Sequence, residues 1–161
     1  MKPCAQATGH RRDEATYRLF LQDRSIGLGF GDELGDLSKL ESNPQAFRDQ
    51  WLKKHPESSP KQANIFYAMF YSFIHRVKIG DFVVYAPTWR ERKVYVGKVI
   101  GPYRYNRSLR PFYSHRRSVE WRKEFYRSSF SPEALRGIRV KLAIFHARNE
   151  AFLAELSEKL K

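Results

Sequence analysis

Residues 78–100 read KIGDFVVYAPTWRERKVYVGKVI. Two runs rich in β-branched and aromatic residues, at 82–86 and 94–100, lie on either side of a polar stretch at 87–93. Such side chains pack well on a pleated sheet, and a short polar break between two such runs is typical of a hairpin. Residues 78–81 contain a Gly-Asp pair, which is typical of a turn that leads into the first run. The stretch therefore predicts two antiparallel strands joined by a loop.

Strand patterns occur in four other segments, at residues 17–22, 26–36, 116–121 and 138–145. In each, apolar side chains recur at every second position or gather in a short run. The segment at 26–36 holds four glycines and is expected to pass from a short strand into a loop.

Three helices are expected between and after these strands. Asn43-Pro44 is typical of a helix start, with Asn as the N-cap and Pro at the first helical position. A second helix is expected to open near Ser59-Pro60, and a third at about residue 147. Each carries an apolar stripe that predicts packing onto a core. The stripes are Phe47 and Trp51 in the first helix, Phe66, Phe70, Phe73, Ile74 and Val77 in the second, and Phe152, Leu156 and Leu160 in the third.

The order of these elements predicts an α+β fold. Five or six short strands, with helices inserted early in the chain, favour a small, mostly antiparallel β-barrel with flanking helices. Residues 1–13 are polar and unpatterned, so we expect a flexible tail there. The remaining residues, 14–161, are enough for one domain with its own core.

Positive charge is concentrated in one part of the chain. Between Arg90 and Arg127 there are twelve Lys or Arg against three acidic residues, a surplus of 12 − 3 = +9 in a protein whose net charge is +13. Eight aromatic residues lie in the same stretch. Clustered cations attract a polyanion by releasing its counterions, and exposed rings stack on bases, so we expect a nucleic-acid ligand. The alternative is a solvated basic face over a core rich in strand aromatics.

Other partners and cofactors find less support. The sequence has no apolar run near the length of a spanning helix, and residues 1–10 lack the apolar segment of a signal peptide, so we expect no membrane association. One cysteine, Cys4, fits a reducing cytoplasm. The five histidines show no metal-ligand spacing with that thiol, so we expect neither a metal nor a cofactor.

Catalytic patterns are also weak. Asp81 followed by Glu91-Arg92-Lys93 has the order of a metal-dependent nuclease site, in which carboxylates hold Mg²⁺ and lysine polarises water. In such nucleases the Glu and Lys lie inside a strand, whereas residues 90–93 are expected at a hairpin tip. His115 is flanked by Arg116 and Arg117, which favours a phosphate contact or a surface histidine over a general base. We therefore expect no enzymatic activity from the chain alone.

Several segments in series resemble a known family. They are SIGLGFG at 25–31 with LGDLS at 34–38, KIGDFVV at 78–84, VGKV at 96–99 with GPYRY at 101–105, and HRRSVEW at 115–121. In this order the chain resembles, over about residues 17–145, the N-terminal DNA-targeting domains of methyl-directed (type IV) restriction systems of the McrB and Mrr kind. Those domains belong to the PUA-like superfamily, which includes EVE and YTH modules.

The resemblance implies a curved barrel that cradles nucleic acid and captures an extruded base in an aromatic pocket. Phe30, Tyr105 and Tyr113 are the candidates for that pocket; family members commonly have Trp at the position of Phe30. Phe112 or Tyr113 is the nearest counterpart of a YTH cage residue. Candidates for contacts with the nucleic-acid backbone are Arg104, Arg107, Arg110, His115, Arg116 and Arg117.

The sequence thus leads to one main hypothesis and two alternatives. The main one is a non-enzymatic DNA-binding domain of a modification-dependent restriction system, which reads a short site and delivers a separate or fused motor and nuclease to it. Capture of a flipped base would let it inspect the Watson–Crick edge and any methyl group. The alternatives are an RNA-binding module of the PUA or YTH kind and the Mg²⁺-dependent nuclease.

Overall fold

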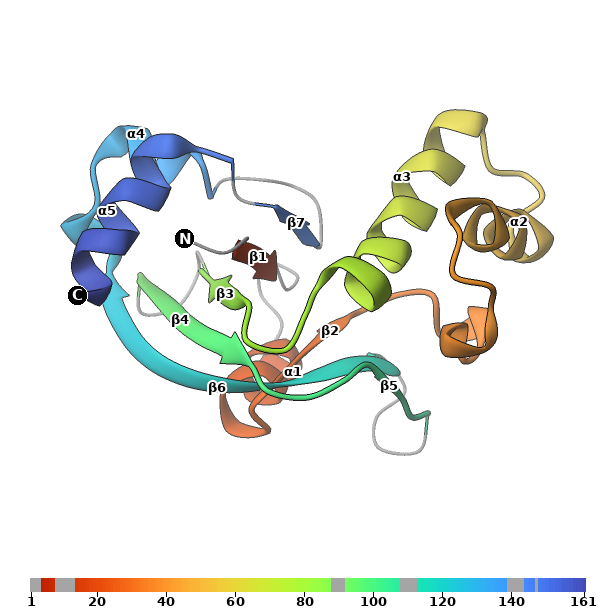
Figure 1. Cartoon of the computed structure of the whole chain (residues 1–161), viewed down its shortest axis with the longest axis horizontal. Coiled ribbons are helices and arrows are strands. Elements are labelled where there is room, and N and C mark those ends of the chain that lie inside the picture. The colour runs from red at the N-terminus through yellow and green to blue at the C-terminus, as the bar shows by residue number, and fades with distance from the viewer. Residues whose placement is uncertain (1–3, 8–13, 88–91, 108–112, 139–143, 147) are drawn as a thin grey trace.

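A computed structural model of the chain describes residues 4–7, 14–87, 92–107, 113–138, 144–146 and 148–161. Its strands form one mixed sheet in the order β2–β6–β4–β3–β1–β7, and β5 also pairs with β6 (Figure 1). The strands are β1 Cys4–Ala7, β2 Ser25–Leu28, β3 Phe82–Tyr85, β4 Lys93–Val99, β5 Arg104–Tyr105, β6 His115–Tyr126 and β7 Ile144–His146.

Helices lie at both ends of this sheet, with α2 and α3 at one end and α4 and α5 at the other (Figure 1). The α-helices are α1 Glu14–Tyr17, α2 Pro44–Lys54, α3 Pro60–Tyr71, α4 Pro132–Arg136 and α5 Glu150–Leu160. Two π-helical turns, Arg18–Gln22 and Ser72–Arg76, extend α1 and α3. Short 3₁₀ turns occur at Asp32–Leu34, Leu37–Lys39 and Arg127–Ser129. The α+β class is as predicted.

The predicted hairpin is formed by β3 and β4, which pair antiparallel with Val84 opposite Val96. β6 is twice as long as the predicted strand at 116–121, and it pairs with β2, β4 and β5. A β-bulge interrupts its pairing with β4 between Val96 and Gly97. A Cβ at Gly97 would lie 2.7 Å from the carbonyl oxygen of Glu120, so the close approach of β4 to β6 requires glycine there.

The sheet is open rather than closed. All of its strand pairs are antiparallel except β1 with β3, which is parallel. Among the described strands, β2 and β7 are the two ends of the path and do not pair with each other. The closed barrel expected from the strand count is therefore not seen, because that count does not specify a pairing between the first and last strands.

β3 separates two hydrophobic cores, and this explains why its sequence is a continuous apolar run. Val83 and Tyr85 lie in one core, with Phe20, Phe70 and other buried residues. Val84 lies in the second core, with residues of β4, α4 and α5. Successive side chains of a strand point to opposite faces, so a strand covered on both faces has no polar alternation.

The three predicted helices are confirmed, and the first two begin at the predicted caps. The Asn43 side chain accepts a hydrogen bond from the Ala46 amide at 2.9 Å. Ser59 and Gln62 form a reciprocal capping box at the start of α3. In α5 the cap is Asn149, and Phe152 and Leu156 are buried.

Three predictions about local structure need correction. Residues 17–22 continue a helix instead of forming a strand, because Thr16, Leu19 and Phe20 are all buried, and this i, i+3, i+4 spacing suits a helix. Residues 4–7 form β1 within the expected tail. The predicted strand at 138–145 does not begin at Ile138, which lies in a turn after the unpredicted helix α4. Its last two residues are the start of β7, and residues 139–143 lie outside the described residues.

No helix in the described part of the chain is both long and apolar enough to cross a membrane.

Candidate nucleic-acid interface

Exposed arginines gather where β5 pairs with β6. Arg104 lies directly opposite Arg116 in the antiparallel register. Arg104 and Arg107 are exposed and Arg116 is half-buried. The Arg104 guanidinium donates to the Ser118 hydroxyl, and Arg116 Nε donates to the Tyr113 carbonyl at 2.5 Å. Two of the predicted phosphate-binding residues, Arg104 and Arg116, are thus brought together on the sheet, and a third, Arg107, follows shortly after the end of β5.

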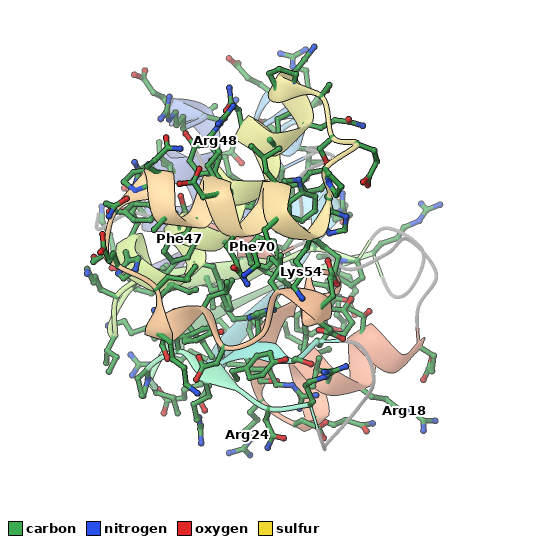
Figure 2. The ribbon with its side chains drawn as sticks, turned by 90° about the vertical axis from the view of Figure 1, so that its right-hand side faces the viewer. Arg18, Arg24, Phe47, Arg48, Lys54 and Phe70 are labelled. Atoms are coloured by element: carbon green, nitrogen blue, oxygen red, sulfur yellow. The ribbon has the colours of Figure 1, made fainter. Side chains whose placement is uncertain are left out.

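A fourth exposed arginine, Arg24, comes from a distant part of the sequence and lies beside the edge of β6 that pairs with β2. β2 pairs with β6 so that Ser25 lies opposite Ser118, and the Val119 amide donates to the Arg24 carbonyl at 2.8 Å. Arg24 is exposed, and Figure 2 shows it projecting outward from the ribbon. Sequence reasoning missed this residue because only the pairing of β2 with β6 places it there. We call Arg24, Arg104, Arg107 and Arg116 the arginine surface.

Arg117 is not part of this surface, which corrects the prediction that it contacts phosphate. Its side chain is only 5% exposed. Its guanidinium donates to the carbonyls of Phe73 at 2.8 Å, Ile74 at 2.7 Å and Gly101 at 3.3 Å. Burial lowers the pKa of Arg117, and the nearby Asp81 carboxylate opposes this shift. The cation therefore joins β6 to the π-helical turn that follows α3.

His115 is also buried, so the predicted phosphate contact of this residue is corrected too. Its Nε2 donates to the Gly31 carbonyl at 2.9 Å, and its Nδ1 lies 2.8 Å from the Tyr103 hydroxyl. Burial lowers the pKa of His115 and so favours the neutral ring. With Nε2 protonated, Nδ1 is an acceptor for the Tyr103 hydroxyl proton. The histidine thus fixes the loop after β2 against β6.

Tyr113, predicted to line a base pocket, lies in the core. Its hydroxyl is 2.5 Å from the Thr16 hydroxyl, and its ring contacts Phe20 edge to face at 5.9 Å. The ring also covers Gly27 and Gly29, where a Cβ would come within about 3 Å of it. A ring with these neighbours offers no face to a base, so Tyr113 is withdrawn from the predicted pocket.

Phe30 and Tyr105 are each half-buried and have different partners. Phe30 packs edge to face on Phe66 and Phe70 of α3, with centroid distances of 5.5 and 5.2 Å. Tyr105 donates its hydroxyl to the Asp32 carbonyl at 3.0 Å, and burial raises its pKa. The predicted set of three therefore does not form one aromatic cage in this structure, while contacts of Phe30 and Tyr105 with a base remain predictions.

The Asp81 carboxylate has a structural role. It accepts a hydrogen bond from the Lys78 amide at 2.8 Å and so closes the turn before β3. Lys93 forms an ion pair with Glu124 at 2.7 Å. Glu91, Arg110 and Phe112 lie outside the described residues. In the part of the chain that the structure describes, no group of three or more His, Cys, Asp or Glu side chains could hold a metal ion.

Comparison with known families places the chain in a described family. Residues 6–141 fit the family model described as a domain of unknown function (DUF8426). The chain belongs to this family. The DUF8426 region contains all four residues of the arginine surface and ends before α5. No curated protein and no solved structure matches the chain.

Proposed function

We propose that this DUF8426 domain binds nucleic acid through the arginine surface, with duplex DNA as its preferred ligand. The observation that carries the proposal is the register of β5 and β6, which sets Arg104 directly opposite Arg116. Like charges at directly opposed positions destabilise a strand pair. A polyanion laid across the pair offsets that cost, because each phosphate then lies near two guanidinium groups.

The surface is suited to the backbone of the ligand rather than to its bases. Arginine contacts with phosphate fix the register and orientation of a protein on DNA and carry no sequence information. The net charge of +13 adds a long-range attraction that speeds encounter with a polyanion. Recognition of a particular base therefore requires other groups, and we propose Phe30 and Tyr105 for contacts with it.

The wider role is proposed from the resemblance to DNA-targeting domains of methyl-directed restriction systems. In this proposal the open sheet is related by descent to a PUA-like barrel, and the domain reads a short, modified site in the cytoplasm. It has no catalytic activity of its own and delivers a separate or fused motor and nuclease. The alternative ligand is RNA, and competition between DNA and RNA oligonucleotides of matched sequence distinguishes the two.

The test of the arginine surface is the salt dependence of binding. Arg104→Ala and Arg116→Ala should each weaken binding to duplexes of any sequence, and each should flatten the plot of log K against log salt by about 0.9 for every phosphate that the variant no longer neutralises. Fluorescence anisotropy at several salt concentrations measures both quantities. Arg136→Ala, which removes an exposed cation from α4, is the matched control and should leave the slope unchanged. A slope that stays the same in both surface variants would refute the proposed interface.

The absence of catalysis is tested separately. The chain alone should leave plasmid DNA and RNA intact with Mg²⁺ or Mn²⁺. Metal-dependent nicking that disappears in Glu91→Gln would contradict the proposal and favour the nuclease. Asp81→Asn is a poor probe for this purpose, because the Asp81 carboxylate closes a turn and its removal perturbs folding.

A further inference from the structure

Two exposed isoleucines lie close together at one end of the sheet. Ile79 is 60% exposed and Ile100 is 54% exposed. Within the part of the chain that the structure describes, the other exposed large apolar side chains are Ile65 and Tyr126. An exposed apolar side chain is common, and two neighbouring ones on a highly charged protein form a small apolar patch that is available to a partner.

Backbone hydrogen bonds hold the two isoleucines beside each other. The Gly80 amide donates to the Val99 carbonyl at 2.8 Å, so the residues next to this bond, Ile79 and Ile100, are neighbours across the sheet end. The turn that carries Ile79 is well fixed. Gly80 has a φ of 92°, a conformation that favours glycine, and Asp81 accepts from the Lys78 amide at 2.8 Å. Ile79 is therefore presented on a rigid tip.

The apolar patch borders the arginine surface. The Ile100 amide donates to the Ser118 carbonyl at 2.9 Å, and the Ser118 hydroxyl accepts from the Arg104 guanidinium. Lys78 is exposed immediately before Ile79. Each isoleucine thus has a cation near it, with Lys78 next to Ile79 in the chain and Arg104 linked to Ile100 through Ser118.

We propose that Ile79 and Ile100 form a wedge that inserts between adjacent base pairs of the bound duplex. The proposal rests on the function proposed above. Apolar side chains such as isoleucine are used in this way by proteins that unstack and kink DNA, and phosphate contacts hold the duplex while they insert. The nearby cations favour an anionic occupant, since a purely apolar partner would leave Lys78 and Arg104 opposite uncharged surface. The function proposed above makes that occupant a nucleic acid.

The wedge also fits the energetics of base inspection. Opening a base step costs stacking free energy, and side chains that fill the gap recover part of it. A stiff tip inserts at a smaller entropy cost than a flexible loop, because its conformation is already fixed before binding. The Ile79 tip meets this condition.

The experiment uses the whole chain and a duplex with a donor dye at one end and an acceptor dye at the other. A kink brings the two dyes closer and raises energy transfer, whatever the position at which the wedge inserts. 2-Aminopurine at several positions of a second duplex reports unstacking. The wild-type protein should raise energy transfer and brighten 2-aminopurine. Ile79→Ser with Ile100→Ser should bind about tenfold more weakly, with neither optical change and with an unaltered salt slope. Ile65→Ser on α3 is the matched control and should behave as wild type.

Failure of the wedge and failure of the proposed function give different experimental results. If the double variant binds and bends DNA as the wild type does, while Arg104→Ala still flattens the salt slope, the wedge is wrong and the proposed function stands. If the wild type binds no DNA and no RNA, the proposed function fails and the wedge with it. If the double variant fails to bind vesicles of phosphatidylserine and phosphatidylcholine that the wild type binds, yet still binds DNA normally, the isoleucine pair contacts a lipid surface and the wedge is refuted. Thermal melting of every variant checks that it is folded.

Discussion

The guanidinium of Arg117 bonds three backbone carbonyls, and two of these belong to the π-helical turn that ends α3. Carbonyls at a helix end have no partner within the helix, so the cation satisfies groups that would otherwise be buried and unbonded. Its positive charge also suits the negative end of the helix dipole. Arg117 is therefore a structural residue within a basic segment.

Replacing Arg117 should test this role through stability. Arg117→Ala should lower the free energy of unfolding by roughly 3 kcal/mol or more, because it leaves buried carbonyls without donors and opens a cavity. Arg117→Lys should recover only part of that stability, since an ammonium lacks the planar fork that reaches all three oxygens. Urea unfolding measures the change, and Arg104→Ala is the exposed control. An Arg117→Ala protein as stable as wild type would contradict this assignment.

His115 predicts a dependence of stability on pH. Burial holds its pKa below the unfolded value of 6.5, so the unfolded chain takes up a proton where the folded chain does not. Its contribution to stability is therefore complete above pH 6.5 and is lost as the pH falls through 6.5 toward the folded pKa, at a rate of at most about 1.4 kcal/mol per pH unit. Urea midpoints between pH 7.5 and 5.5 should fall accordingly.

The matched variant for this prediction is His115→Gln, which does not titrate. It should be less stable than wild type at pH 7.5, and its urea midpoint should change less with pH. Burial lowers the pKa of His75 in the same direction, with Lys78 and Arg117 adding to the shift, so His75→Gln separates the second contribution. If His115→Gln keeps the full pH dependence of the wild type, His115 is not its source.

For single residues, the sequence shows which side chains are basic but does not always predict which of them are exposed. The basic stretch and its arginines are evident in the sequence, yet nothing local tells Arg116 from Arg117. Adjacent residues of a strand point to opposite faces, so one of the two had to point inward. Which one is decided by the packing of the segment after α3 on β6, a contact between residues more than 40 positions apart.

Among the local elements, the turn after β2 depends on Gly31. Gly31 has a φ of 82°, and a Cβ there would collide with the ring of Phe70. Gly35 has a similar φ of 76°, but nothing lies within 4 Å of its Cβ position. The two glycines share the same sign of φ but differ in their surroundings and in ψ, which is 15° at Gly31 and −164° at Gly35.

Each glycine makes its own prediction. Gly31→Ala should cost more than the roughly 1–2 kcal/mol of a left-handed residue, because the Phe70 ring has to move and the loop that meets Tyr105 and His115 shifts with it. Gly35→Ala should cost backbone strain alone, on the order of 1–3 kcal/mol, because a φ of 76° with a ψ of −164° is a conformation nearly confined to glycine. Thermal melts of both variants measure these costs. A loss at Gly31 no larger than that of left-handed strain alone would mean that Phe70 yields freely.

Elements with local signals are predicted well. The Asn43 and Ser59 caps lie within a few residues of the helices they start, and their side chains make the expected bonds. The hairpin of β3 and β4 likewise follows from neighbouring residues. The strand prediction at residues 17–22 is wrong. It rested on the alternation of Tyr17, Leu19 and Leu21 with the residues between them. The two fully buried residues, Leu19 and Phe20, are instead adjacent, which an alternating strand on one core does not give.

At the scale of the whole molecule, the sequence predicts the class of fold but not the order of the strands. The α+β class follows from counting elements. The pairing of β2 with β6 and of β1 with β3 joins residues about 90 and 80 positions apart, and no local pattern encodes such contacts. Both the position of Arg24 in the arginine surface and the open sheet follow from these pairings.

The position of β1 in the sheet has a consequence for the synthesis of the protein. It lies early in the chain, and its two neighbours in the sheet, β3 and β7, begin at Phe82 and Ile144. During translation, residues 4–7 emerge before both partners and wait for them to be synthesised. A strand that waits with unpaired amides and carbonyls is a template for other chains, so a ribosome-bound chain is open to aggregation until β7 has emerged. The order of the strands therefore makes β1 wait longer for its pairing to be completed than any other described strand.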